Sequence, residues 1–221
     1  MGTPNFVKFS RVRGKLWDEV ERLERTLSGR WKTELRRAAR LRPSHKTYDG
    51  GLELEGDIVN CRSIADAMSI TEGSKAFGLI YLARPVPAHL YFYFFDMAAD
   101  AFSFSLSIES SIVYYRNDDF PSGCWLEGVL TSIVCSMGPL VCGYGADNAY
   151  QLQHVPLDPD VVLTRLRSGE LLRLPRPTFH AISTKLIDKN EIDALIEQYK
   201  PSPSPNYRMA PGYHVLGSIG L

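Results

Sequence analysis

The sequence FGLIYLARPVPAHLYFYFFDMAADAFSFSLSI, residues 77–108, contains three successive β-strand signals. Aromatic and aliphatic residues dominate FGLIYLA (77–83), HLYFYFF (89–95) and FSFSLSI (102–108), and proline-rich or acidic turns separate them. In the third stretch large apolar residues alternate with serine, so one face should be packed and the other wet or covered by polar groups. The simplest arrangement of the three strands is an antiparallel meander.

Upstream of these strands the chain has a helical period. Apolar residues recur in steps of three and four from Leu16 to Leu27, which predicts an amphipathic helix ending near Ser28. The same spacing continues from Trp31 to Leu41 and predicts a second helix, which Pro43 would stop. The outer face of that second helix would carry Arg36, Arg37, Arg40 and Arg42. Residues 48–57 then predict a turn and a short edge strand, and Asn60 or Ser63 would cap a short helix.

Downstream of the strands, helices and strands alternate. Residues 125–137 predict an apolar helix lying on the sheet, and LVCGYG (140–145) predicts a buried strand. Asp158 and Pro159 are typical of a helix start, and Asp188 with Glu191 forms a capping box after a strand signal at 178–187. YHVLGSI (213–219) predicts a last strand.

Together these signals predict an α+β fold with a largely antiparallel central sheet and flanking helices. We expect residues 1–221 to form a single domain. Within it, residues 1–47 would be a basic helical N-terminal arm, and the Pro/Ser connector at 201–205 would precede the C-terminal strand.

The charges are balanced overall but segregated along the chain. Residues 1–47 hold 13 Lys+Arg against 5 Asp+Glu, residues 48–160 hold 4 against 15, and residues 161–221 hold 8 against 5. An acidic middle stretch suits docking against a basic partner. The basic first stretch could contact nucleic acid, or it could lie on the acidic middle of the same protein.

The composition indicates a protein of the cytoplasm. The N-terminus lacks the apolar core of a secretory signal, and no run of residues approaches the ~20 apolar residues that cross a bilayer. Cys61, Cys124, Cys135 and Cys142 have neither CxxC spacing nor a regular framework, so we expect buried, reduced thiols.

Motifs for catalysis and for metal or phosphate binding are weak. A Cys142–His154 pair could support a small hydrolase or transferase, although nothing in the spacing requires it. The five histidines form no metal-ligand pattern, and Gly143-Tyr-Gly145 has only the first half of a dinucleotide-binding loop. We therefore expect a protein that is not an enzyme and that needs no metal and no cofactor.

Taken whole, the chain resembles bacterial immunity proteins of polymorphic-toxin and type VI secretion systems, especially those paired with restriction-endonuclease-like nuclease toxins. The residues that carry the resemblance are WDEVERLERTLSGRW (17–31), the strands YFYFF (91–95) and FSFSLSI (102–108), and GPLVCGYG (138–145). The resemblance implies tight stoichiometric binding that neutralises a cognate basic toxin. A small Cys/His-dependent hydrolase or transferase and a nucleic-acid-binding accessory protein are the alternatives.

Acids beside aromatics and loop residues are the expected contacts with such a partner, because rings supply contact area and charges steer the encounter. The candidate contact residues are Asp100, Glu109, Tyr114, Tyr115, Asp118, Asp119, Tyr144 and Asp147. The partner would be a protein, with no membrane involved and nucleic acid disfavoured.

Overall fold

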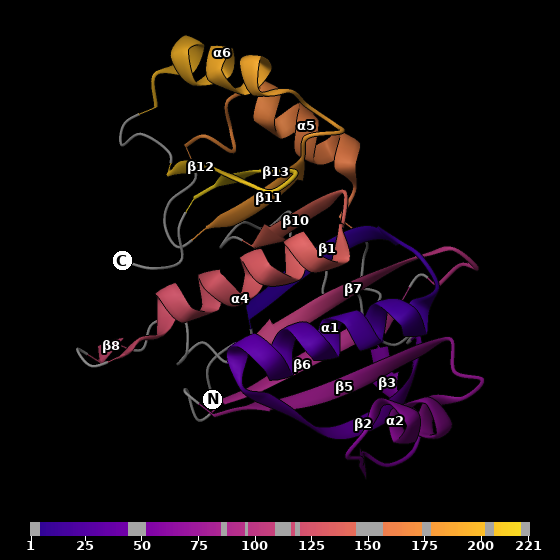
Figure 1. The fold of residues 1–221 in the computed structure, drawn as a ribbon. Helices are drawn as coiled ribbons and strands as arrows, with labels where there is room; N and C mark the ends of the chain where they lie inside the picture. Colours follow the sequence, from indigo (N-terminus) through magenta and orange to yellow (C-terminus); the bar gives the residue numbers. More distant parts are fainter. Residues whose placement is uncertain are drawn as a thin grey trace.

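The structure is a computed structural model that describes residues 5–43, 52–84, 88–95, 97–108, 116–117, 120–144, 157–173, 178–201 and 206–217. A long antiparallel sheet carries helices on both faces (Figure 1). Its first strands are β1 (Asn5–Arg13), β2 (Thr33–Pro43), β3 (Leu52–Leu54), β4 (Val59–Asn60), β5 (Ala76–Ala83), β6 (Ala88–Phe95) and β7 (Ala101–Ile108). Its later strands are β10 (Val141–Tyr144), β11 (Phe179–Ser183), β12 (Tyr207–Ala210) and β13 (Tyr213–Leu216), while β8 (Arg116–Asn117) and β9 (Phe120–Pro121) form a separate ladder.

The helices are α1 (Leu16–Trp31), α2 (Ile64–Thr71), α4 (Ser122–Met137), α5 (Pro159–Arg167) and α6 (Lys189–Tyr199). The predicted α+β class is confirmed.

The strands of the long sheet lie in the order β12-β13-β11-β10-β1-β7-β6-β5-β2-β3, and β4 also pairs with β2. Each pairing in the described residues is antiparallel. The predicted meander is confirmed, because β5 pairs with β6 and β6 with β7. The sheet continues through β1 into the C-terminal strands without a break in pairing.

An aromatic row crosses four strands of this sheet and forms the centre of the core. It consists of Phe77, Phe94, Phe104 and Phe9, which lie directly opposite one another in the strand register. Successive ring centroids are 4.7, 5.5 and 4.3 Å apart. Cross-strand aromatic pairs of this kind stabilise a sheet beyond the burial of their surface. The row therefore explains why the strand signals in residues 77–108 are so aromatic.

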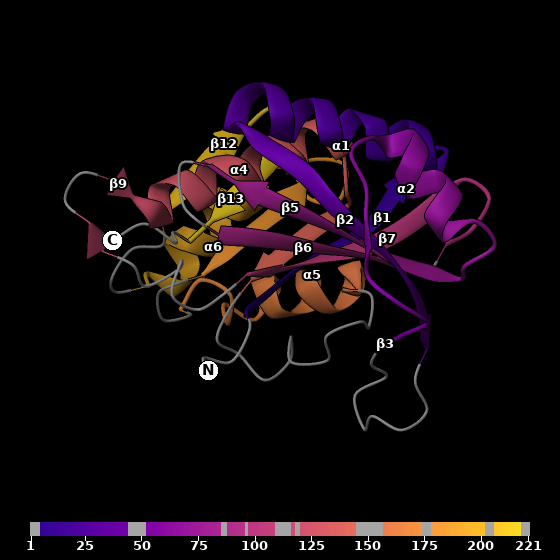
Figure 2. The ribbon, with the colours of Figure 1, turned by 90° about the horizontal axis from the view of Figure 1, so that it is seen from below.

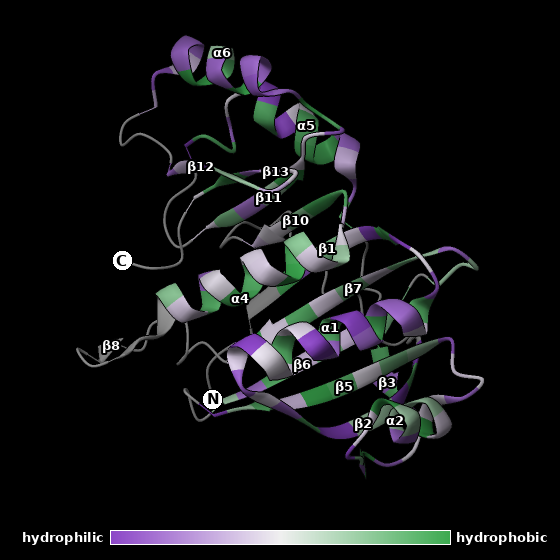
Figure 3. Cartoon of the chain, viewed as in Figure 1, coloured by the Kyte–Doolittle hydropathy of each residue, from purple (hydrophilic) through white to green (hydrophobic). Residues whose placement is uncertain are grey.

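Helices cover the two faces of the sheet at different places. The helices α1 and α4 pack side by side over the face that carries the aromatic row, and α5 and α6 cover the opposite face near β10, β11 and β13 (Figure 2). The second cluster uses Val141, Ile182 and Leu216 from those strands. In Figure 3 strands β5 and β6 are largely hydrophobic, whereas α6 is mostly hydrophilic on its outer side. The helices thus bury one stripe each, as their periodicity requires.

The predicted second helix between Trp31 and Leu41 is wrong, because this segment is strand β2. Helix α1 ends where Lys32 adopts a left-handed conformation, and its N–H bonds to the Leu27 carbonyl. A bulge in β2 then places two residues of that strand against one of β5 between Leu35 and Arg37. As a result Leu35 and Ala38 face the same core although they are three residues apart. The bulge reproduces a helical spacing in a strand, which is why the sequence pattern was misleading.

The basic N-terminal segment is not a helical arm. Strand β1, which the sequence pattern did not predict, lies inside the sheet between β7 and β10, and β2 pairs with β5. A second bulge lies in β1, where Arg11 has a positive φ and the register shifts between Phe9 and Val12. The bulge disrupts the alternation that would have marked a strand. Of the connector at 201–205, residues 202–205 lie outside the described residues.

The predicted helix starts are confirmed at three places. Ser63 caps α2 by accepting a hydrogen bond from the Asp66 N–H, and Asp158 caps α5 by accepting one from the Asp160 N–H. Asp188 caps α6 by accepting from the N–H of Glu191. These caps depend on local contacts alone, so short-range sequence patterns suffice to find them.

Candidate functional site

The structure describes two of the eight candidate contact residues. Glu109, Tyr114, Tyr115, Asp118, Asp119 and Asp147 lie outside the described residues or have side chains that are not described. Tyr144 is only 3% exposed and belongs to the main core, so its assignment as a surface contact is wrong. The residue sits in the buried strand β10 rather than in the loop that follows it. Asp100 is exposed, as expected.

Asp100 lies in the turn between β6 and β7, next to the start of α1. Its carbonyl accepts a hydrogen bond of 2.9 Å from the Gly14 N–H, and the Ala98 N–H donates to the Ala101 carbonyl across the same turn. These contacts hold Met97 of the turn close to Leu16 and Trp17 at the first turn of α1. A surface site that includes Asp100 therefore includes the end of α1.

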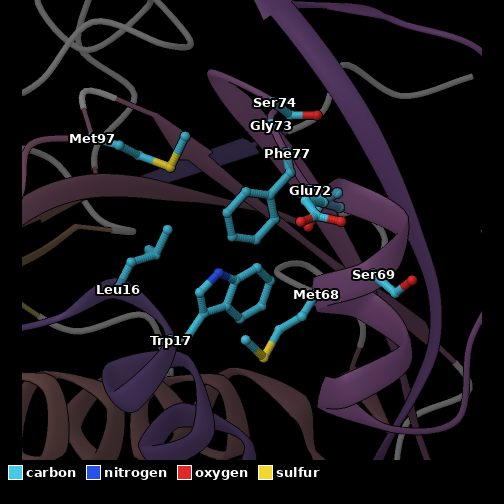
Figure 4. Close-up of a pocket in the computed structure, with 10 residues that line it drawn as sticks. Leu16, Trp17, Met68, Ser69, Glu72, Gly73, Ser74, Phe77 and Met97 are labelled. Atoms are coloured by element: carbon cyan, nitrogen blue, oxygen red, sulfur yellow. The ribbon is translucent and has the colours of Figure 1, made fainter.

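A hollow of about 460 Å³ opens at this corner (Figure 4). We call it the Trp17 hollow. It is lined by Leu16, Trp17, Met68, Ser69, Thr71, Glu72, Gly73, Ser74, Phe77 and Met97. The lining comes from α1, from α2 and the turn that follows it, from β5 and from the β6–β7 turn. Segments as far apart in the chain as those that hold Leu16 and Met97 thus meet here, and periodicity could not have predicted their meeting.

The floor of the Trp17 hollow is rigid and aromatic. The rings of Trp17 and Phe77 stack with centroids 5.0 Å apart and an angle of 14° between their planes. Phe77 in turn stacks on Phe94, so the aromatic row supports the floor from below. A floor of this kind can bind an apolar group, or a cation over a ring face, with little loss of side-chain freedom.

The rim of the hollow combines flexible and charged side chains. Met68 is 39% exposed at the edge of α2, and Figure 4 shows it and Met97 on opposite sides of the rings. Glu72 is exposed and supplies the ionisable group among the described lining residues. Thioethers adapt to irregular partners, and a carboxylate beside a ring favours a basic group. The hollow is therefore suited to a long basic side chain or to another side chain with an apolar stem.

Cys61 and Cys142 are buried, as expected, and do not have the environment of catalytic nucleophiles. The expectation of burial is wrong for Cys124 and Cys135, which are exposed. Cys142 is fully buried, and burial raises the pKa of its thiol well above the ordinary value. Burial, helped by nearby Asp66 and Glu24, raises the pKa of Cys61 to about 11. A nucleophilic cysteine needs the opposite shift. His154, the proposed partner of Cys142, lies outside the described residues.

Within the ranges given above, no group of three or more His, Cys, Asp or Glu side chains is placed to hold a metal ion. Among the described helices, none combines the length and the apolar composition that a membrane crossing requires.

The serine face of β7 is buried rather than wet. Ser103, Ser105 and Ser107 are each at most 6% exposed, and Lys8 of β1, directly opposite Ser105, is 3% exposed. Burial lowers the pKa of the Lys8 ammonium to about 8. A buried amine at the centre of a sheet is a feature that the sequence analysis missed. Its only signal was a lysine between Val7 and Phe9, two residues that face the core.

Replacing Lys8 with methionine should stabilise the protein at neutral pH. The pKa of Lys8 is lower in the folded protein than in the unfolded chain, so protonation favours the unfolded state below about pH 8. This cost, on the order of 3 kcal/mol, should disappear as the pH rises from 8 to above 10.5. We expect the difference in unfolding free energy between Lys8→Met and the wild type to shrink over that range. Denaturant titrations at pH 7, 8, 9 and 10 measure it, and a difference that does not change with pH would contradict the expectation.

Comparison of the chain with protein-family models, with curated proteins and with solved structures found no match. The functional conclusion therefore depends on the residues of the site and on the sequence pattern.

Proposed function

We propose that this protein neutralises a basic protein toxin by binding it, and that the Trp17 hollow is part of the contact surface. The observation that carries the proposal is the combination of an aromatic floor with the carboxylate of Glu72 at the rim. Aromatic anchors in a preformed pocket are typical of the residues that dominate binding energy at protein interfaces.

The chemistry of the hollow specifies what it would accept. The methylene stem of a lysine or arginine can lie over the Trp17 ring, and its cationic head can reach Glu72. Asp100 in the adjoining turn would add to the attraction of a basic partner. Inhibition would come from binding alone, so it would need no catalysis and no cofactor. The hollow is preformed, so binding would need little change of shape in this protein.

The class of toxin follows from the sequence resemblance. The partner would be a nuclease of a bacterial polymorphic-toxin or type VI secretion pair, and this chain its immunity protein. A nuclease has a basic cleft for its substrate, which an acidic surface can cover. The candidate residues outside the described ranges, Asp118 and Asp119 among them, remain part of this proposal.

A matched pair of methionine variants tests the role of the hollow. Met68 lines the hollow, whereas Met209 is 47% exposed on β12 at the far edge of the sheet. Tagged wild type, Met68→Lys and Met209→Lys would each be used to capture partners from the native cell lysate, and captured proteins would be assayed for nuclease activity. We expect wild type and Met209→Lys to capture a basic nuclease and to inhibit it at one-to-one stoichiometry. Met68→Lys should bind it at least about tenfold more weakly, because a cation in the hollow repels the incoming basic group.

Other outcomes would count against parts of the proposal. Equal binding and inhibition by all three proteins would remove the hollow from the interface. The Asp118→Lys/Asp119→Lys double variant then tests the predicted acidic segment separately, through the association rate and its salt dependence. If the wild type captures no protein whose activity it inhibits, the result would contradict the neutralising function itself.

A further inference from the structure

A second cavity, of about 400 Å³, is formed at the side of the sheet where β2, β5 and β6 meet. We call it the arginine pocket. It is lined by Arg36, Arg37, Asn60, Cys61, Arg62, Ile80, Leu82 and His89. It shares no lining residue with the Trp17 hollow. Ile80, which lines the arginine pocket, lies on the opposite face of β5 from Leu79, the preceding residue, which belongs to the main core.

The bulge in β2 builds this pocket. An uninterrupted strand would send Arg36 and Arg37 to opposite faces of the sheet. The extra residue at the register shift instead leaves both arginines exposed between Leu35 and Ala38, which face the core. Strand β4 pairs with β2 at Arg37 and Asn60, which brings Arg62 to the same rim. Two arginines from one strand and one from the segment after β4 therefore line the same pocket.

The positive charge of the arginine pocket is only partly neutralised. Glu34 accepts hydrogen bonds from both Arg36 and Arg84, at 2.8 and 2.6 Å, so one carboxylate serves two arginines. Asp66 accepts from the backbone N–H of Arg62 and is attracted to its side chain. Within the described part of the chain, the guanidinium of Arg37 makes no hydrogen bond and no ion pair. No carboxylate is among the described residues that line the pocket.

We propose that the arginine pocket binds the terminal phosphate of a small phosphate monoester, with Arg37 and Arg62 as its main ligands. Guanidinium groups match phosphate oxygens in pairs, and a monoester carries up to two negative charges at neutral pH. The volume lies within the range of small-molecule sites. Ile80, which is 8% exposed, and Leu82 supply an apolar wall for the organic part of the ligand. Phosphate binding in the arginine pocket is independent of the proposed neutralisation of a toxin, because the two sites share no lining residue.

Calorimetric titration with four probes tests this proposal. Inorganic phosphate and adenosine 5′-monophosphate carry the expected group, adenosine lacks it, and a short single-stranded DNA with a 5′-hydroxyl carries only phosphodiesters. The variants are Arg37→Gln and Arg62→Gln, with Arg25→Gln as a control that removes one exposed arginine of α1 that does not line the pocket. Thermal unfolding of each variant checks that the fold is kept.

We expect the wild type to bind inorganic phosphate and the nucleotide but not adenosine. Arg37→Gln and Arg62→Gln should each weaken that binding by about tenfold or more, and Arg25→Gln by less than about twofold. Absence of binding at millimolar phosphate and nucleotide would overturn the proposal. A loss of affinity in Arg25→Gln as large as that in Arg37→Gln and Arg62→Gln would also overturn it. Binding of the DNA without binding of inorganic phosphate or the nucleotide would also overturn it, because a surface that reads a nucleic-acid backbone would then be present instead.

Discussion

Phe104→Ala should lower the free energy of unfolding by about 3–5 kcal/mol. Phe104 is fully buried at the centre of the aromatic row, where it stacks on Phe9 at 4.3 Å and on Phe94 at 5.5 Å. Truncation to alanine removes these contacts and leaves a cavity that strands β1 and β6 cannot close, because each is fixed by pairing with its neighbours. Denaturant unfolding at pH 7 measures the loss.

The conservative variant Phe104→Leu provides the control for this experiment. It keeps most of the apolar volume and should cost clearly less than alanine, on the order of 1–2 kcal/mol. A loss below about 1 kcal/mol for Phe104→Ala would mean that the aromatic row is not the centre of the core.

Acidification should destabilise the protein by several kcal/mol through His180. This residue is 1% exposed in β11, and burial, with a smaller effect of Arg165, lowers the pKa of its imidazole to about 3. Between pH 6.5 and pH 3 the unfolded chain takes up a proton that the folded protein does not. The stability that the neutral imidazole provides is therefore present above pH 6.5 and is lost as the pH falls through this range, by ~5 kcal/mol in all.

The matched test compares two histidines. His180→Gln removes the buried imidazole, and His89→Gln removes an exposed one. We expect the unfolding free energy of His180→Gln to depend less steeply on pH between 6.5 and 4 than that of the wild type. The His89→Gln variant is the control for the loss of an exposed histidine. Equal slopes for His180→Gln and the wild type would show that another group dominates acid unfolding. The comparison of slopes remains valid even if His180→Gln is less stable at pH 7.

The two proposed sites arise from different structural causes. The Trp17 hollow forms where a helix start, a helix end and a strand turn meet, and the arginine pocket forms where a bulge interrupts a strand. The basic stretch at residues 1–47 also contacts the acidic middle of the chain, as Arg42 pairs with Glu53 and Arg40 donates to the Ile70 carbonyl. The charge segregation in the sequence is thus partly resolved inside the protein.

Local patterns predicted much of the fold but little of the site. Helix α1, the strands β5 to β7 and the three caps could be read from the chain, because each depends on neighbours within a few residues. Of the predicted contacts, Asp100 is exposed next to the Trp17 hollow. Tyr144 was chosen as a surface contact but is buried in β10, because the predicted strand over residues 140–145 already includes it and the glycines beside it suggested a loop instead.

The sequence by itself determined that an aromatic antiparallel meander, with capped amphipathic helices, forms the centre of this protein. Only the tertiary structure decided that β1 and β2 are strands of the same sheet, because bulges at Arg11 and Arg36 disrupt the period of two that identifies a strand. It also decided where Trp17, Met68 and Met97 come together, and where Arg37 and Arg62 do. Periodicity reports which face of an element is buried, whereas the meeting of distant elements depends on how those faces pack.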